Sequence, residues 1–255
     1  MKLGICCESD NFELAKQIGF DYAEPSIQPF RAYDEKTLKE IKKKTEDIGF
    51  EIDGFKNFFS GDISLYDNSL EFLVSYAERN FEVSRLFNCD YNVVGSGKSR
   101  SIPEGMERSK AEHIFMNVIN AIAEKGKEYG VKLYIEPLNY GETNYINTLK
   151  DGIEFKRKLN NDNVGCLIDF FHFFKNKEDL SELDMLNPGE LTHVHLARPN
   201  DDRDAPIKED APVIKQWADK LKEIGYSGRV SLECVWRKGL NNSGKEALEQ
   251  LQLFK

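Results

Sequence analysis

The sequence has no apolar run that approaches the roughly 20 residues needed to span a bilayer. Its first residues, MKLGICCESD, contain too short an apolar stretch for a signal peptide. The sequence also has fewer basic than acidic residues. Its 35 basic and 44 acidic residues give a net charge of -9. Binding to a phosphate backbone normally requires a basic stripe. We therefore expect a cytoplasmic protein whose partners include neither a membrane nor a nucleic acid.

Two common motifs are missing as well. The five cysteines are odd in number and form no C-x-x-C spacing, so neither a disulfide framework nor a zinc knuckle is predicted. No G-x-G-x-x-G loop follows the first apolar run, where CCESD stands instead. This absence argues against an open sheet that binds a dinucleotide.

The composition is that of a globular domain. The chain is 40% hydrophobic and 31% charged, which allows a sizeable core under a polar surface. Its 255 residues suit either two small domains or one α/β barrel, a fold of about 250 residues. No linker or low-complexity tract divides the chain, so we expect a single domain over residues 1–255.

One pattern recurs along the chain: an amphipathic segment ends in glycine and an apolar run follows at once. It appears in AKQIGFDYAE, TEDIGFEIDGF, GKEYGVKLYIE and LKEIGYSGRVSLE. Glycine suits the left-handed position just past a helix, so each of these glycines predicts a helix that gives way to a strand. They are Gly19, Gly49, Gly130 and Gly225.

Eight strands alternate with helical segments in this interpretation. Eight alternations in one domain favour a closed (β/α)8 TIM barrel of the α/β class, with a doubly wound open sheet as the alternative. The strands are predicted at residues 2–6, 21–26, 50–56, 90–97, 131–139, 163–172, 191–197 and 228–235.

The last four predicted strands each carry a ligand-type residue towards their end: Glu136, Asp169, His195 and Glu233. Parallel barrel strands deliver their C-terminal ends to one face, where catalytic residues collect. Taken singly, each residue is equally well explained as a helix cap or an ion-pair partner. Together, three carboxylates and an imidazole need a cation, and we expect no lysine or arginine of these strands to supply it. A shared divalent metal ion is therefore predicted.

The donor set indicates the type of ion. Three oxygen donors and one nitrogen favour Mn²⁺ or Mg²⁺ over zinc, which prefers more nitrogen and sulfur. Co²⁺ and Zn²⁺ remain as alternatives.

Longer stretches around these residues resemble the xylose isomerase-like TIM barrels, the sugar phosphate isomerase/epimerase family that includes the ketose 3-epimerases and endonuclease IV. The stretches are YIEPLNYGETNYINT, VGCLIDFFHF, THVHLARPNDDR and GYSGRVSLEC. The resemblance implies the same four residues as metal ligands, and Glu142, His172 and Arg203 as substrate contacts. The loop after Arg203 departs from the family, because APIK stands where relatives often carry a Pro-Gly-x-Gly turn.

The resemblance implies a metal-dependent isomerase or epimerase that acts on a small sugar or sugar phosphate. Glu136 and Glu233 would transfer a proton on opposite faces of the sugar through a metal-stabilised enediolate. Family members commonly form dimers or tetramers, so a homo-oligomer is expected. The alternatives are a lyase that dehydrates a cyclic keto-polyol and a non-catalytic sugar-binding protein. A nuclease like endonuclease IV fits less well, because its histidine-rich three-metal cluster contrasts with only four histidines here.

Other polar residues have two interpretations each. Residues 95–100, GSGKSR, either cradle a phosphate or form a flexible barrel loop, which we favour because the P-loop spacing is absent. Glu24 is expected to reach the pocket or to brace it. His193 is expected to support the site or lie in the core, and Asn139 to brace Glu136.

Overall fold

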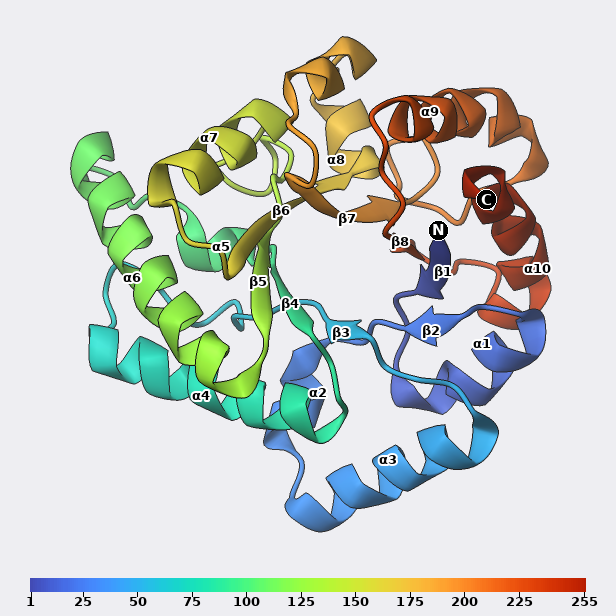
Figure 1. Ribbon diagram of the computed structural model, residues 1–255, viewed down its shortest axis with the longest axis horizontal. Helices are drawn as coiled ribbons and strands as arrows, with labels where there is room; N and C mark the ends of the chain where they lie inside the picture. The colour runs from blue at the N-terminus through green and yellow to red at the C-terminus, as the bar shows by residue number, and fades with distance from the viewer.

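The computed structural model describes residues 1–255 and confirms the predicted (β/α)8 TIM barrel (Figure 1). All paired strands are parallel, in the order β2-β1-β8-β7-β6-β5-β4-β3. Two isolated bridges, Ala23 with Ile52 and Ser26 with Lys56, join the two ends of this sheet. The strands are β1 Lys2–Ile5, β2 Tyr22–Ala23, β3 Gly54–Phe55, β4 Tyr91–Val94, β5 Lys132–Ile135, β6 Val164–Asp169, β7 Leu191–Leu196 and β8 Arg229–Leu232.

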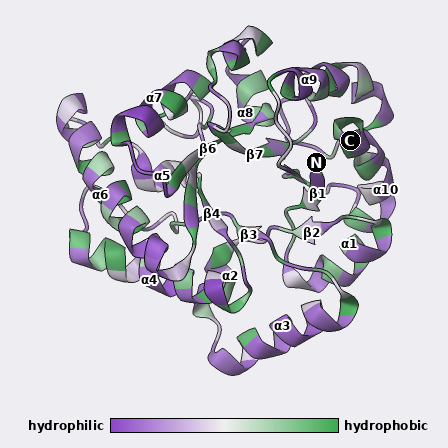
Figure 2. Ribbon diagram, viewed as in Figure 1, coloured by the Kyte–Doolittle hydropathy of each residue, from purple (hydrophilic) through white to green (hydrophobic).

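Helices form the outer ring and carry hydrophilic residues on their exposed sides (Figure 2). None of them combines the length and the apolar character that crossing a membrane requires. The α-helices are α1 Phe12–Ile18, α2 Ile27–Ala32, α3 Glu35–Ile48, α4 Leu70–Leu86, α5 Gly97–Arg100, α6 Arg108–Tyr129, α7 Leu149–Leu159, α8 Phe170–Lys175, α9 Ala211–Glu223 and α10 Leu240–Leu251. Short 3-10 helices occupy η1 Ser9–Asn11, η2 Leu180–Met185, η3 Lys208–Asp210 and η4 Gln252–Phe254.

Glycines end the helices where the sequence predicts. Gly19, Gly49 and Gly130 are the C-terminal caps of α1, α3 and α6, each in the left-handed conformation. Gly225 also has a positive φ, and it follows the end of α9 by two residues. Because only glycine adopts this conformation readily, these positions turn the chain from each outer helix back to a strand.

The strands are shorter than predicted, and two of the predicted ends lie in helices. The sixth strand stops at Asp169 and the helix α8 begins at Phe170, so His172 lies on a helix. The fourth stops at Val94, and Gly97 begins α5. After Asp169 the apolar character continues in Phe170 and Phe171, which concealed the change of backbone conformation.

Three tyrosines fill the barrel interior, and the neighbouring strand places a glycine opposite each ring. A Cβ atom on Gly4 or on Gly54 would overlap the tyrosine ring that lies over it. The rings therefore occupy space that any larger residue would take. The pairs are Gly4 with Tyr22, Gly54 with Tyr91, and Gly165 with Tyr134.

We expect the Gly4→Ala variant to lose about 1–3 kcal/mol of unfolding free energy, the usual cost of forcing atoms into a filled core. Urea unfolding measures this change. Gly61→Ala is the matched control, because its Cβ would meet its nearest neighbour, Lys98 Cδ, at an ordinary distance of 3.6 Å. Equal stability of the two variants would contradict a close glycine–tyrosine contact in the barrel.

Candidate functional site

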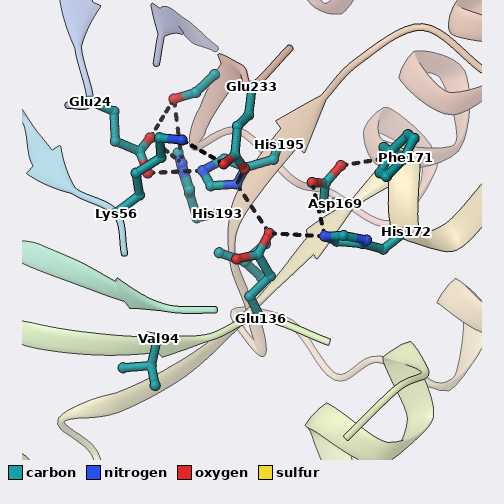
Figure 3. Close-up of polar contacts among 12 residues, drawn as sticks. Glu24, Lys56, Val94, Glu136, Asp169, Phe171, His172, His193, His195 and Glu233 are labelled. Carbon is teal, nitrogen blue, oxygen red and sulfur yellow. Dashed lines mark hydrogen bonds and ion pairs between the residues drawn. The ribbon is translucent and has the colours of Figure 1, made fainter. Parts of the chain in front are cut away.

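The four predicted ligands meet at the C-terminal end of the barrel. Glu136 directly follows β5, Asp169 ends β6, His195 lies in β7 and Glu233 directly follows β8. Each offers one ligand atom, and the four atoms lie within 4.8 Å of one another. Figure 3 shows the four side chains directed towards one another. Residues almost 100 positions apart therefore form one cluster, because parallel strands end at one face.

Asp169 combines the two roles that the sequence left open for it. Its Oδ1 accepts a hydrogen bond of 2.8 Å from the Phe171 N–H and so caps α8. Its Oδ2 faces the cluster and contacts Arg203 Nη2. The helix cap therefore orients the carboxylate, and the second oxygen stays available as a ligand.

Two of the ligand atoms make no hydrogen bond of regular geometry. They are Glu136 Oε1 and His195 Nδ1, and both are buried. His195 Nδ1 lies 2.7 Å from Glu233 Oε2 and 3.5 Å from Glu136 Oε1. Unpartnered polar atoms are costly inside a protein, and a divalent cation between them would satisfy both. Three carboxylates and one imidazole thus fit a single divalent ion.

Basic side chains also contact the cluster, contrary to the expectation that a metal alone would balance it. Arg203 Nη2 touches Asp169 Oδ2 and lies 2.7 Å from Glu233 Oε2. Lys56 Nζ lies 2.8 Å from Glu233 Oε1. Although burial opposes ionisation, these two cations hold the pKa of Glu233 well below its ordinary value. The resemblance placed Arg203 at the site only as a substrate contact, and Lys56 was missed because it follows β3, outside the four strands that carry the ligands.

Glu24 braces the site from below. It is fully buried, and its Oε1 accepts a hydrogen bond of 2.8 Å from His195 Nε2. Its Oε2 accepts hydrogen bonds from His193 Nε2 at 2.8 Å, the Ser231 hydroxyl at 2.6 Å and the Tyr91 hydroxyl at 3.0 Å. With its Nε2 proton donated to Glu24, His195 presents Nδ1 to the cluster, as metal-binding histidines commonly do. Of the two predicted roles for Glu24, the structure supports bracing.

This arrangement separates the pKa values of the two histidines. Burial alone would lower the pKa of His195, but the Glu24 and Glu233 carboxylates outweigh it and raise that pKa well above its ordinary value. Burial dominates at His193 and lowers its pKa, despite the contact with Glu24. Burial also opposes ionisation of Glu24, yet the two imidazoles hold its pKa far below the usual range. Without a metal, His195 is therefore protonated and Glu24 is ionised.

Asn139 connects two of the predicted substrate contacts instead of bracing Glu136. Its Nδ2 donates hydrogen bonds of 2.8 Å to Glu142 Oε1 and to His172 Nδ1. The Gly141 N–H donates to Asn139 Oδ1, which fixes the orientation of the amide. His172 Nε2 lies 3.3 Å from Arg203 Nη1 and 3.8 Å from Glu136 Oε1. His172 and Glu142 thus line the site beside Glu136.

Arg203 is held in a backbone conformation that arginine rarely adopts. Its φ of 54° lies in the left-handed region. Two hydrogen bonds to the chain after β8 hold it: Nε donates to Glu233 O at 2.9 Å, and the Val235 N–H donates to Arg203 O at 2.7 Å. Asp204 also forms a bridge with Val235. The loop that departs from the family pattern therefore runs beside β8 and directs the guanidinium into the cluster.

The GSGKSR segment supports Glu136 and does not form a phosphate cradle. Arg100 is fully buried, and its Nη2 donates hydrogen bonds to Glu136 O at 2.7 Å and to Ile146 O at 3.2 Å. Burial lowers the pKa of Arg100 to about 10. Gly95 leaves space for the carboxylate, because a Cβ there would overlap Glu136 Oε2. The basic residue that suggested anion binding is thus used to hold the end of β5.

Comparison with known proteins identifies a family and several distant relatives. Residues 12–255 match the family model described as a xylose isomerase-like TIM barrel. The chain is 28% identical to the inosose isomerase of Halalkalibacterium halodurans, over 57% of this chain and 54% of that protein. It is 33% identical to the 2-oxo-tetronate isomerase of Haemophilus influenzae, over 53% and 52%. It is 23% identical to the D-psicose 3-epimerase of Ruminiclostridium cellulolyticum, over 89% and 78%. The chain thus spans about half the length of the first two relatives.

A solved structure with the same architecture is the apo form of 3-keto-D-glucoside 4-epimerase from E. coli. The TM-score is 0.81, and the alignment covers 99% of each chain at 20% sequence identity. At this identity the likeness establishes the barrel fold.

We expect Mn²⁺ binding near pH 7 to release about one proton per ion, because His195 must lose its proton to present Nδ1. The affinity should consequently rise with pH, by about tenfold per unit, until the raised pKa of His195 is reached. Calorimetric titrations in buffers of different ionisation enthalpy count the protons, and titration of EDTA calibrates them. Binding without proton release would contradict a protonated His195.

We expect Glu24→Gln to weaken Mn²⁺ binding by about 10- to 100-fold, since the partner that orients His195 loses its charge. Glu51→Gln serves as the control, because the Glu51 side chain is 82% exposed. Calorimetry gives both affinities, and circular dichroism shows whether each variant is folded. A folded Glu24→Gln variant with unchanged affinity would exclude this bracing role.

Proposed function

The chain belongs to the xylose isomerase-like TIM barrel family, and we propose that it is a metal-dependent isomerase or epimerase of a ketose or related sugar. The observation that carries the proposal is the convergence of Glu136, Asp169, His195 and Glu233 around two unpartnered ligand atoms. The names of the relatives, an inosose isomerase, a 2-oxo-tetronate isomerase and a psicose 3-epimerase, support the same class of reaction.

The four clustered residues would hold one divalent ion, with Mn²⁺ or Mg²⁺ favoured by the oxygen-rich donor set. When bound, such an ion supplies Lewis acidity that polarises a carbonyl oxygen of the substrate. The protein supplies the remaining chemistry, which is to position the sugar and to move a proton.

Glu136 and Glu233 are the proposed proton carriers. Glu136 Oε1 faces the position proposed for the ion, so the second carboxylate oxygen of Glu136 is proposed to accept a proton from the carbon next to the carbonyl. Glu233 enters from β8, three strands further around the barrel. If Glu233 returns a proton to the opposite face of the resulting enediolate, the product is an epimer. If the proton returns to the neighbouring carbon, the product is an aldose–ketose isomer.

Three residues are proposed to orient the sugar. Arg203 extends its guanidinium into the cluster, and His172 directs its Nε2 there. Glu142 lies at the rim, where its side chain is 45% exposed, and Asn139 links it to His172. Donors and acceptors fixed in this way bind hydroxyl groups in a defined orientation, which proton transfer from a single carbon requires.

Two alternatives use the same site. A lyase would expel a hydroxyl group from the same enediolate of a cyclic keto-polyol, whereas a sugar-binding protein would need neither proton carrier. A histidine-rich nuclease site is disfavoured, because three of the four clustered ligand residues are carboxylates and His113 is exposed on α6. That leaves His195 as the single imidazole in the cluster.

We expect the Mn²⁺-loaded protein to incorporate deuterium from D₂O into at least one sugar of a panel, at the carbon next to the carbonyl. The panel contains D-fructose, D-tagatose, an inosose and 2-oxo-tetronate, and NMR identifies the labelled carbon. Metal-free protein is the control. Loss of water would identify a lyase, and tight binding without exchange would identify a sugar-binding protein.

We expect Glu136→Gln and Glu233→Gln to slow deuterium incorporation by about 10²- to 10⁴-fold, the usual contribution of a general acid or base. Glu51→Gln, on the surface, should exchange at the rate of the unmodified protein. Because both residues are also proposed ligands, the variants are compared at Mn²⁺ concentrations that saturate each. Normal exchange by saturated Glu233→Gln would remove that residue from the mechanism.

A further inference from the structure

We infer that Arg100 is a positioning residue for the proposed reaction, although its hydrogen bonds reach no side chain of the cluster. It fixes Glu136, the proposed proton acceptor, and joins it to the loop of residues 137–147 that carries Glu142. The inference rests on the proposed function and deepens it, because it adds a residue that acts on the reaction through Glu136.

The guanidinium of Arg100 is used entirely for backbone carbonyls. The side chain is fully buried at the end of α5. Its Nη1 donates a hydrogen bond of 3.2 Å to Val94 O, and its Nη2 donates to Glu136 O at 2.7 Å and to Ile146 O at 3.2 Å. A buried guanidinium is costly and is normally paired with a carboxylate. At Arg100 the buried charge instead holds three carbonyls together.

These carbonyls belong to segments that end or turn at this point. Val94 ends β4, and Glu136 directly follows β5. Ile146 has a φ of 57°, in the left-handed region that β-branched residues rarely adopt. Its carbonyl also accepts a hydrogen bond of 3.2 Å from the Leu138 N–H, which closes the loop after β5. Arg100 therefore joins two strand ends to the point where this loop closes.

The place of the Glu136 carboxylate depends on this backbone. The Glu136 N–H donates a hydrogen bond of 3.3 Å to Val94 O, the same carbonyl that Arg100 Nη1 holds. The side chain packs against Gly95, where a Cβ atom would overlap Glu136 Oε2. The carboxylate thus has little room to compensate for a movement of its own backbone. A misplacement of about 1 Å can slow a reaction by about 10²-fold.

The short helix α5 also contacts the loop that carries Glu142. A Cβ atom on Gly97 would lie 2.7 Å from Glu142 O, so the two backbones are in close contact. Asn139 Nδ2 donates to Glu142 Oε1 at 2.8 Å within the loop. On the other side, the Tyr66 hydroxyl donates a hydrogen bond of 2.8 Å to Arg100 O. The proposed proton acceptor and a proposed substrate contact are therefore both placed by α5.

The first test is the Arg100→Lys variant. Lysine keeps the positive charge, but its ammonium lacks the planar fork that spans separate carbonyls. At saturating Mn²⁺ and sugar, we expect deuterium incorporation to slow by about 10- to 100-fold. The KM for the sugar should change by less than about threefold, because Glu142 keeps its contacts with Asn139 and Gly97.

Arg79→Lys is the matched control. Arg79 also donates to two backbone carbonyls, of Arg31 and Tyr33, but it does so between the outer helices α4 and α2. This variant should incorporate deuterium at the rate of the unmodified protein. Urea unfolding and circular dichroism show that both variants are folded under the conditions of the assay.

A double variant tests whether Arg100 acts through Glu136. In the Glu136→Gln background, Arg100→Lys should slow the remaining exchange by less than about twofold, since the group that it positions is already lost. An equal loss in both backgrounds, or no loss in either, would overturn the inference. If Arg100→Lys does not fold, Tyr66→Phe replaces it, because it removes one hydrogen bond to Arg100 O from a half-buried side chain. Tyr66→Phe should slow exchange severalfold, and an unchanged rate would count against the positioning role.

Failure of the inference differs from failure of the proposed function. Exchange that proceeds at the normal rate in folded Arg100→Lys removes the role of Arg100 and leaves an isomerase or epimerase. If no sugar of the panel exchanges, the proposed function fails, and Mn²⁺ affinity decides the inference. Because Glu136 is also a proposed ligand, calorimetry should then show Mn²⁺ binding about tenfold weaker in Arg100→Lys and unchanged in Arg79→Lys. Equal affinities of the two variants would overturn the inference.

Discussion

The hydrogen bond between Glu24 Oε1 and His195 Nε2 is the interaction on which the site depends. It connects the chain after β2 with β7 across the centre of the barrel and fixes the imidazole ring. A buried carboxylate is tolerated there because four side-chain donors surround it. Tyr91, one of those donors, lies in place because Gly54 opposite it has no side chain. The geometry of the cluster therefore depends on the packing of the barrel interior.

The negative charges of the cluster must also be balanced by positive charges nearby. Three carboxylates lie close together at the strand ends, so their mutual repulsion must be offset. Arg203 and Lys56 provide part of that balance from two separate segments of the chain. Protonation of His195 provides more of it in the absence of a metal. A divalent ion would replace that proton, which is why we expect metal binding to release a proton.

Much of the fold and the ligand set could be read from local patterns. Gly19, Gly49 and Gly130 end helices because a left-handed residue is needed there, and this requirement is local. The last strands carry Asp169 and His195 at their C-terminal ends, and parallel strands bring such ends together. The errors concern side chains whose partners are distant. Asn139 was assigned to Glu136 by proximity in sequence, yet it bonds His172, which is 33 residues away.

The sequence by itself determined the alternation of helices and strands and the identity of the four clustered residues, because periodicity, glycine positions and strand ends are properties of short segments. Only the tertiary structure decided which charges surround them. Lys56 and Glu233 are 177 residues apart, and no local pattern relates them. A phosphate cradle at residues 95–100 was the less favoured interpretation, and only the structure shows that Arg100 is buried and bonded to backbone carbonyls. The pairing of Lys56 with Glu233 arises when the sheet closes, because closure brings the first strands beside the last.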